Sequence, residues 1–318
     1  MSTDITFVTA VSRYLVQRRA LGFDLRIAGK QLLAFARFAD EHAEGKPLTI
    51  GLAVTWARAA THPSSITGAR RLEIVRPFAQ WLRQLDPRTE VPAGGLLGRG
   101  HRRLVPHVYT DDEVLSLLEE AARLSPPNGL RPASIVALLG LLACTGIRVS
   151  EALGLRRNDV DLDDALLIVR RAKFRKSRFV PLHSTAAGAL QRYATLRDRR
   201  APCVASDAAF FVIDGGITLT YSKVRTAFRR IRIGLGWEQT IGRRPRVHDL
   251  RHTFACRQLL YWHEQGTDVG RHILDLSTYL GHAKVSDTYW YLSGFPELLE
   301  LTARRFESFA IAGEEVRS

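Results

Sequence analysis

Apolar residues recur at helical spacing along the first ninety residues. The first stripe contains Phe7, Val11 and Tyr14, and three further stripes follow before residue 83. Because positions three or four residues apart share one face of an α-helix, each stripe predicts a helix with a buried side. We therefore expect four helices around a common core, with Pro77 kinking or restarting the fourth.

Glycine, proline and charged residues replace this period between residues 91 and 108. Such a change in composition is typical of a linker. The glycines match neither the spacing of a dinucleotide-binding fingerprint nor that of a phosphate-binding loop, so no nucleotide cofactor is expected. The pattern predicts a helical domain over 1–90, a linker over 91–108 and a second domain over 109–318.

The second domain combines helices with a few strands. Thr110 and Glu113 have the spacing of a capping box, which opens a helix that runs to Leu124. Two short β-rich runs, 165–171 and 178–182, flank a basic turn and predict a hairpin. Further helical patterns cover 131–144, 184–199, 220–235, 248–265, 270–280 and 284–292. These features predict a mainly helical α+β fold with a small antiparallel sheet.

The charge of the chain indicates the kind of partner. The 318 residues are 46% hydrophobic, which predicts a folded core, and the formal net charge is +14. The excess is divided between residues 1–100, with +6, and residues 101–318, with +8. A basic protein without a run of 18 apolar residues suggests nucleic acid first and anionic lipid second, with no membrane span. The cysteines are few and scattered, as expected for buried thiols in a reducing cytoplasm: Cys144, Cys203 and Cys256.

Four short segments carry the candidate chemistry. They are TGIRVSEALGL (145–155), RRAKFRKSRFVPL (170–182), HDLRHTFA (248–255) and LGHAKVSDTYWYL (280–292). In the second segment, six of the nine residues from Arg170 to Arg178 are basic. Such a turn is either a solvated surface or a contact to phosphate groups.

The third segment places unlike groups on one side of a helix. His248 and Arg251 are three residues apart, so an imidazole that accepts a proton lies beside a guanidinium that can bind phosphate. His248, His252 and Cys256 follow at intervals of four, which also suggests zinc. Three groups rising along one helix cannot all reach one tetrahedral ion, and we expect no metal.

The order of these features is more specific than any one of them. An arginine, a lysine-bearing hairpin, His-x-x-Arg, Gly-His and a tyrosine nine residues later closely resemble the catalytic domain of the tyrosine recombinases, the phage-integrase family. The resemblance covers roughly residues 108–295, and the 1–90 region resembles that family's helical, SAM-like core-binding domain. The hairpin departs from the family's glycine-rich turn, because Ala172 and Phe174 flank the lysine.

The resemblance implies a set of site residues. The catalytic residues would be Arg148, Lys173 (with Lys176 as second choice), His248, Arg251, His282 and Tyr291. Other basic residues around the hairpin would bind DNA: Arg170, Arg171, Arg175, Lys176 and Arg178. Tyr289 lies about 200° around the helix from Tyr291 and is expected to be a packing residue.

The resemblance also implies a mechanism. Tyr291 would attack a phosphodiester, form a 3′-phosphotyrosyl link and free a 5′-hydroxyl. The two arginines and His282 would stabilise charge on the phosphate, His248 would act as general base and Lys173 as general acid. The guanidinium groups would supply the charge that a metal otherwise brings, so no metal or other cofactor is expected.

Partners and alternatives follow from the same resemblance. We expect the protein to bind double-stranded DNA and to assemble on synapsed sites as a homo-tetramer or together with a partner recombinase. We expect it to act in the cytoplasm, in the integration or transposition of a mobile element. The segment after Tyr291 would form a helix that packs on its own domain or on a neighbouring subunit. The alternatives are a type IB topoisomerase-like enzyme and a non-catalytic DNA-binding protein on the same scaffold.

Overall fold

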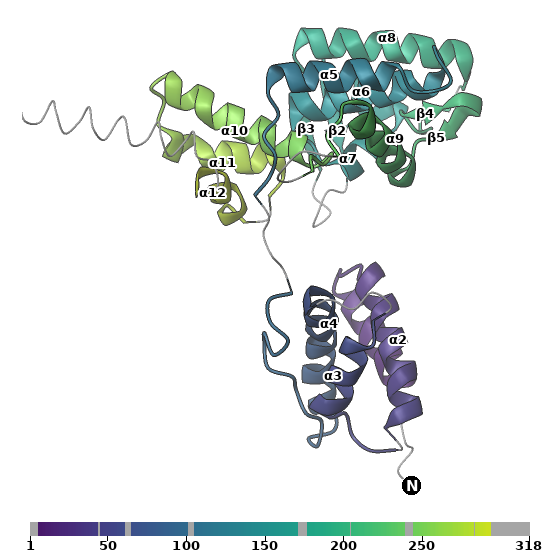
Figure 1. Ribbon diagram of the computed structural model, residues 1–318, viewed down its shortest axis with the longest axis vertical. Helices are drawn as coiled ribbons and strands as arrows, with labels where there is room; N and C mark the ends of the chain where they lie inside the picture. Colours follow the sequence, from purple (N-terminus) through teal and green to yellow (C-terminus); the bar gives the residue numbers. More distant parts are fainter. Residues whose placement is uncertain are drawn as a thin grey trace, which may run out of the picture. The chain divides into compact units, whose positions relative to one another are not determined.

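The chain divides into two compact units, Met1–Leu104 and Val105–Ser318. The computed structural model describes residues 6–293 apart from 44, 61–64, 101–104, 171–176, 204, 239–243 and 283, and of residues 65 and 290–293 it describes only the backbone. Figure 1 follows the two units along the chain, with the first in purple to blue and the second in teal to yellow.

The first unit consists of four helices, and polar side chains cap the starts of two of them. Its helices are α1 (Phe7–Ala20), α2 (Arg26–His42), α3 (Ile50–Arg58) and α4 (Ser65–Arg83). The Asp40 carboxylate of α2 accepts hydrogen bonds from the Phe7 and Val8 amides at 2.6 and 3.1 Å, which would otherwise lack partners at the start of α1. Thr49 accepts from the Leu52 amide and opens α3 in the same way.

Aromatic side chains fill the centre of this unit. Phe35 and Phe78 are fully buried, and Phe35 packs edge-to-face on Trp56 with ring centroids 5.2 Å apart. Tyr14 meets Phe78 in a similar geometry at 5.6 Å. The apolar stripes of the sequence therefore do form the core, and the prediction of four helices is confirmed.

Two features of the first unit make the expectation more specific. Pro77 lies inside α4, which continues as a single helix from Ser65 to Arg83 rather than restarting. The missing proline N–H removes one hydrogen bond, and burial of apolar residues on both sides of it holds the helix together. Part of the expected linker also packs on α4, since Arg70 donates to the Gly100 carbonyl at 2.7 Å and Leu97 joins the apolar core.

The second unit is built around α6, which lies against α5, α8 and α10. All the leucines of α6 and its isoleucine are buried, as its nearly continuous hydrophobic sequence predicts. The helices of this unit are α5 (Asp111–Ala122), α6 (Leu130–Thr145), α7 (Val149–Leu153), α8 (Ser184–Arg200), α9 (Tyr221–Gly234), α10 (Asp249–Glu264), α11 (Val269–Leu280) and α12 (Ser286–Ser293).

A small antiparallel sheet accompanies these helices. Its strands are β1 (Val160–Asp161), β2 (Leu166–Val169) and β3 (Arg178–Pro181), in the order β1-β2-β3. Leu167 and Val180 lie opposite each other and are both buried, and Val169 lies opposite Arg178. The predicted hairpin is confirmed, whereas its turn lies outside the described residues.

A second, two-stranded sheet of β4 (Val212–Ile213) and β5 (Ile217–Thr218) has no counterpart in the sequence prediction. Helices α10, α11 and α12 gather at one side of the unit (Figure 1), and α10 and α11 share a small apolar cluster that includes Leu259, Leu276 and Leu280. Across the part of the chain that the structure describes, no helix is at once long and apolar enough to cross a membrane.

Candidate active site

A glycine turn presents the first candidate residue. Gly146 ends α6 with a φ of +61°, and a Cβ there would lie 2.5 Å from Cδ1 of Phe254, so both backbone and space require glycine. Ile147 is buried next in the chain, and Arg148 then takes the N-cap position of α7. The Thr-Gly-Ile-Arg sequence therefore positions Arg148 by turning the chain sharply at the end of a buried helix.

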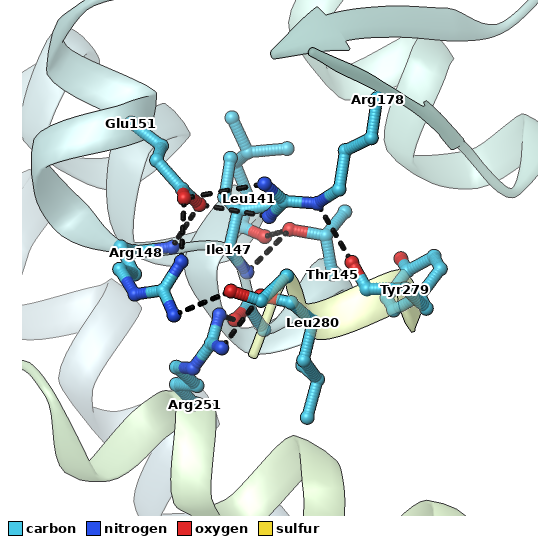
Figure 2. Close-up of polar contacts among 11 residues, drawn as sticks. Leu141, Thr145, Ile147, Arg148, Glu151, Arg178, Arg251, Tyr279 and Leu280 are labelled. Carbon is cyan, nitrogen blue, oxygen red and sulfur yellow. Dashed lines mark hydrogen bonds and ion pairs between the residues drawn. The ribbon is translucent and has the colours of Figure 1, made fainter. Parts of the chain in front are cut away.

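Arg148 is held by a carboxylate and by a backbone carbonyl (Figure 2). Its Nη1 lies 2.7 Å from Oε1 of Glu151, and its own amide donates to Oε2 of Glu151 at 3.0 Å. Its Nη2 donates to the carbonyl of Gly281 at 2.8 Å, although 133 residues separate the two positions. The guanidinium thus has a fixed orientation at the junction of α7 and α11.

Arg251 lies deeper in the same junction. It is 2% exposed, and its Nη1 donates to the Gly146 carbonyl at 2.7 Å. Its Nη2 donates to the Leu280 carbonyl, also at 2.7 Å. Arg251 therefore connects α10 both to the turn that positions Arg148 and to the end of α11 (Figure 2).

Three successive carbonyls at the end of α11 each accept a hydrogen bond from a different arginine. Arg178 donates from Nε to Tyr279 at 2.7 Å, while Leu280 and Gly281 accept from the two arginines already described. The last carbonyls of a helix have no partner within the helix and carry the negative end of its dipole. We call this set, the carbonyls of residues 279–281 with their three arginines, the arginine junction.

Glu151 neutralises part of the positive charge. Its side chain is 7% exposed and forms ion pairs with Arg148 and with Arg178, whose Nη2 lies 2.8 Å from Oε2. Burial on its own would raise the pKa of this carboxyl, but hydrogen bonds from Arg178 and Arg148 lower the pKa to about 2. Glu151 is therefore ionised at neutral pH and acts as the bridge between the two guanidinium groups.

The candidate histidines are uncharged at neutral pH. Burial, followed by the charges of Arg251 and Arg148, lowers the pKa of His282 to about 4, and its Nδ1 lies 2.6 Å from Oγ1 of Thr288. Burial and then Arg251 also lower the pKa of His248, which stands at the start of α10. A neutral imidazole has one nitrogen that accepts and one that donates, which suits either proton transfer or hydrogen bonding to phosphate.

His252 packs its ring against that of His248, with centroids 4.9 Å apart. Burial, followed by repulsion from His248 once that ring is itself protonated in acid, lowers the pKa of His252 to about 3. Within the described residues, no three His, Cys, Asp or Glu side chains are grouped so that they could hold a metal ion. The spacing of His248, His252 and Cys256 along α10 thus does not produce a metal site there.

The structure describes the surroundings of the remaining candidates only in part. Tyr291 lies in α12, which packs against α10 and α11, and the structure describes only its backbone. Tyr289 is 51% exposed, so the expectation that it is a packing residue is wrong. Arg170 is half exposed and forms an ion pair with Asp159. Several predicted residues fall in the undescribed turn: Arg171, Lys173, Arg175 and Lys176.

The structure thus brings Arg148, Arg251 and the backbone leading into His282 to one place. Sequence reasoning missed Glu151, although its position three residues after Arg148 matches the glutamate of a capping box. Nothing in the sequence signalled the bond from Glu151 to Arg178, because that contact depends on how β3 packs. Whether Arg170 and Arg178 touch DNA stays a prediction.

The chain is similar to proteins of known family. The sequence profile of the phage integrase family matches residues 107–297. A protein of Sinorhizobium fredii named integrase/recombinase y4rB is 38% identical over 308 residues, which are 95% of this chain and 97% of that protein. Tyrosine recombinase XerC of Mycobacterium tuberculosis is 32% identical over 281 residues, 86% of each chain.

Solved structures share the fold at lower identity. The Tn1549 transposon integrase in complex with transposon right end DNA has a TM-score of 0.65 and 18% identity, covering 94% of this chain and 99% of that one. XerH recombinase bound to a palindromic difH substrate has a TM-score of 0.61 and 19% identity, covering 88% and 79%. The family profile and the identities to these relatives show that the chain belongs to the phage integrase family of tyrosine recombinases, enzymes that break and rejoin DNA.

Proposed function

We propose that this protein is a site-specific recombinase that cleaves duplex DNA with Tyr291 and serves the integration or transposition of a mobile element in the cytoplasm. The observation that carries the proposal is the arginine junction, which gathers Arg148 and Arg251 beside the chain leading to His282. Helix α12, which contains Tyr291, packs against both α10 and α11. One positively charged centre and one nucleophile-bearing helix therefore belong to the same unit.

The proposed step transfers a phosphoryl group without hydrolysis. The phenol oxygen of Tyr291 attacks phosphorus, His248 takes the phenol proton, and the 5′-oxygen leaves with a proton from Lys173. A phosphotyrosyl bond replaces the phosphodiester bond, so the reverse attack by a 5′-hydroxyl rejoins the strand. The lowered pKa of His248 supports its role, because only the neutral imidazole accepts a proton.

Charge stabilisation rests on the two arginines. Both guanidinium groups are fixed by backbone carbonyls before substrate binds, so they need little reorganisation when negative charge grows on the non-bridging oxygens. His282 would add a further hydrogen bond from its neutral ring. Loss of one such donor typically lowers a rate by about 10²–10³-fold.

Affinity for DNA is supported by surface charge. Helix α9 contains no acidic residue, and Arg225, Arg229 and Arg230 are exposed on it. Together with the basic hairpin, this surface offers contacts to the phosphate backbone that the sequence reading did not single out. The DNA-bound transposon integrase with the same fold supports the mobile-element role, and assembly as a homo-tetramer or with a partner recombinase completes the proposal.

A nicked suicide substrate tests the chemistry. Duplexes from the DNA that borders the gene, each with a nick beside the cleavage position, should trap a covalent protein–DNA adduct in EDTA, and peptide mapping should place it on Tyr291. Tyr291→Phe should form no adduct, and the matched control Tyr289→Phe should form it normally. Binding without an adduct would favour a non-catalytic DNA-binding protein. Supercoil relaxation without strand exchange would favour a topoisomerase.

A further inference from the structure

Arg178, the first residue of β3, faces into the protein although it ends a strongly basic segment. Its side chain is 12% exposed. All three guanidinium nitrogens have partners: Nη1 and Nη2 lie 3.2 and 2.8 Å from the two carboxylate oxygens of Glu151, and Nε donates to the Tyr279 carbonyl at 2.7 Å. Figure 2 shows the guanidinium between these two acceptors.

This arrangement uses the planar fork of an arginine. Nη1 and Nη2 donate side by side to one carboxylate, while Nε donates to a carbonyl in another direction. This needs several donors fixed in one plane, which a guanidinium has and an ammonium group lacks. The backbone beside Arg178 also leaves no spare room, since a Cβ on Gly281 would lie 2.9 Å from Nη1 of Arg178. Arg178 is therefore fitted to its surroundings rather than solvated.

The contacts of Arg178 join three parts of the candidate active site. Through Glu151 it reaches Arg148, and through the Tyr279 carbonyl it reaches the end of α11, directly before His282. In the sheet it lies opposite Val169, so it also stands at the base of the β2–β3 hairpin. That hairpin contains Lys173, five residues earlier in the chain.

We propose that Arg178 is a positioning residue for strand cleavage rather than a ligand of DNA phosphate. By bonding to both Glu151 oxygens and to the end of α11, it fixes the Arg148 guanidinium and the base of the hairpin relative to each other. The inference rests on the proposed function, since cleavage is the step that it serves.

Substitution by lysine separates the two roles. A phosphate contact tolerates lysine, which keeps the charge, whereas a bidentate fork does not. Arg178→Lys should therefore bind DNA with a dissociation constant within about twofold of the unaltered protein and with the same salt dependence. Its rate of adduct formation at saturating DNA should fall at least tenfold, and that of Arg178→Met about 10²-fold, because small displacements of catalytic groups have effects of this order. Arg192→Met, at an exposed arginine of α8, is the matched control.

Two results would overturn the proposal. One is normal adduct formation by Arg178→Lys. The other is weaker DNA binding by Arg178→Met with an unchanged rate of adduct formation at saturating DNA. In that case the slope of log binding constant against log salt concentration should be smaller by about 0.9, the value expected for one lost phosphate contact. Should the methionine variant fail to fold, the lysine variant still decides between these outcomes.

A titration of Glu151 tests the contact without using activity. Carbon-13 NMR of the labelled carboxyl should show a midpoint near pH 2 in the unaltered protein and a midpoint at least one unit higher in Arg178→Lys. A midpoint that does not move would contradict the bridge even if no DNA is ever cleaved. Absence of any adduct from the unaltered protein, with a midpoint that moves, would instead count against the proposed function alone.

Discussion

Gly281 offers a sharp test of the arginine junction. Gly281→Ala places a methyl group 2.9 Å from Nη1 and 3.1 Å from Cζ of Arg178, and it does so on a backbone with a φ of +68°. The left-handed conformation costs an L-residue about 1–2 kcal/mol. Displacing Arg178 weakens a hydrogen bond to a charged partner, worth about 1.5–3 kcal/mol. Together these give a loss of about 2.5–5 kcal/mol in the free energy of unfolding.

Gly266→Ala separates the two contributions. Gly266 has nearly the same φ, +69°, but a Cβ there meets no atom within 4 Å, so this variant should lose only about 1–2 kcal/mol. Urea titrations of the full chain measure both losses, and trapping on the suicide substrate measures cleavage. We expect cleavage at saturating DNA to fall about 10²-fold in Gly281→Ala and to stay normal in Gly266→Ala. Equal stability and equal cleavage in the two variants would refute the reasoning.

Two further predictions concern protonation and capping. The free energy of unfolding should decline as the pH falls from about 6.5 towards 4, because unfolded His282 takes up a proton near its ordinary pKa, whereas the folded pKa is about 4. Urea midpoints at pH 7 and pH 5 should differ less in His282→Gln, and an identical difference would contradict this cause. Asp40→Ala removes the acceptor for two amides at the start of α1 and should destabilise the first unit by about 1 kcal/mol. Thermal unfolding measures this loss, and an unchanged transition would mean that the cap contributes nothing.

Local patterns explain why so much of the fold could be predicted. A stripe such as Phe7, Val11 and Tyr14 needs only helical spacing and a buried side, and the structure buries Val11 and Tyr14 as expected. The capping box at Thr110 and Glu113 is likewise decided within one turn, and it is present. The continuity of α4 could not be predicted in this way, because packing on both sides of Pro77 outweighs the local cost of the proline.

In the candidate site, too, local features could be predicted and long-range contacts could not. Its residue types and spacings were visible in the sequence because they lie in short segments, and family resemblance gave each a role. The partners of those residues were not visible: Arg148 meets Gly281 across 133 residues, and Arg178 meets Glu151 across 27. Such contacts depend on how α11 and β3 pack against α7, which no local pattern determines.

The carbonyls of residues 279–281 also bear on how the sequence can drift in evolution. Every residue has a backbone carbonyl, so the hydrogen bonds that Tyr279 and Leu280 accept from the arginines do not depend on their side chains. Packing constrains those side chains instead, because Tyr279 stacks on Phe254 and Leu280 is fully buried. Related chains should therefore exchange apolar residues freely at these two positions while retaining glycine at 281. The binding of arginines by this segment would then be hard to recognise from the residue types at positions 279 and 280.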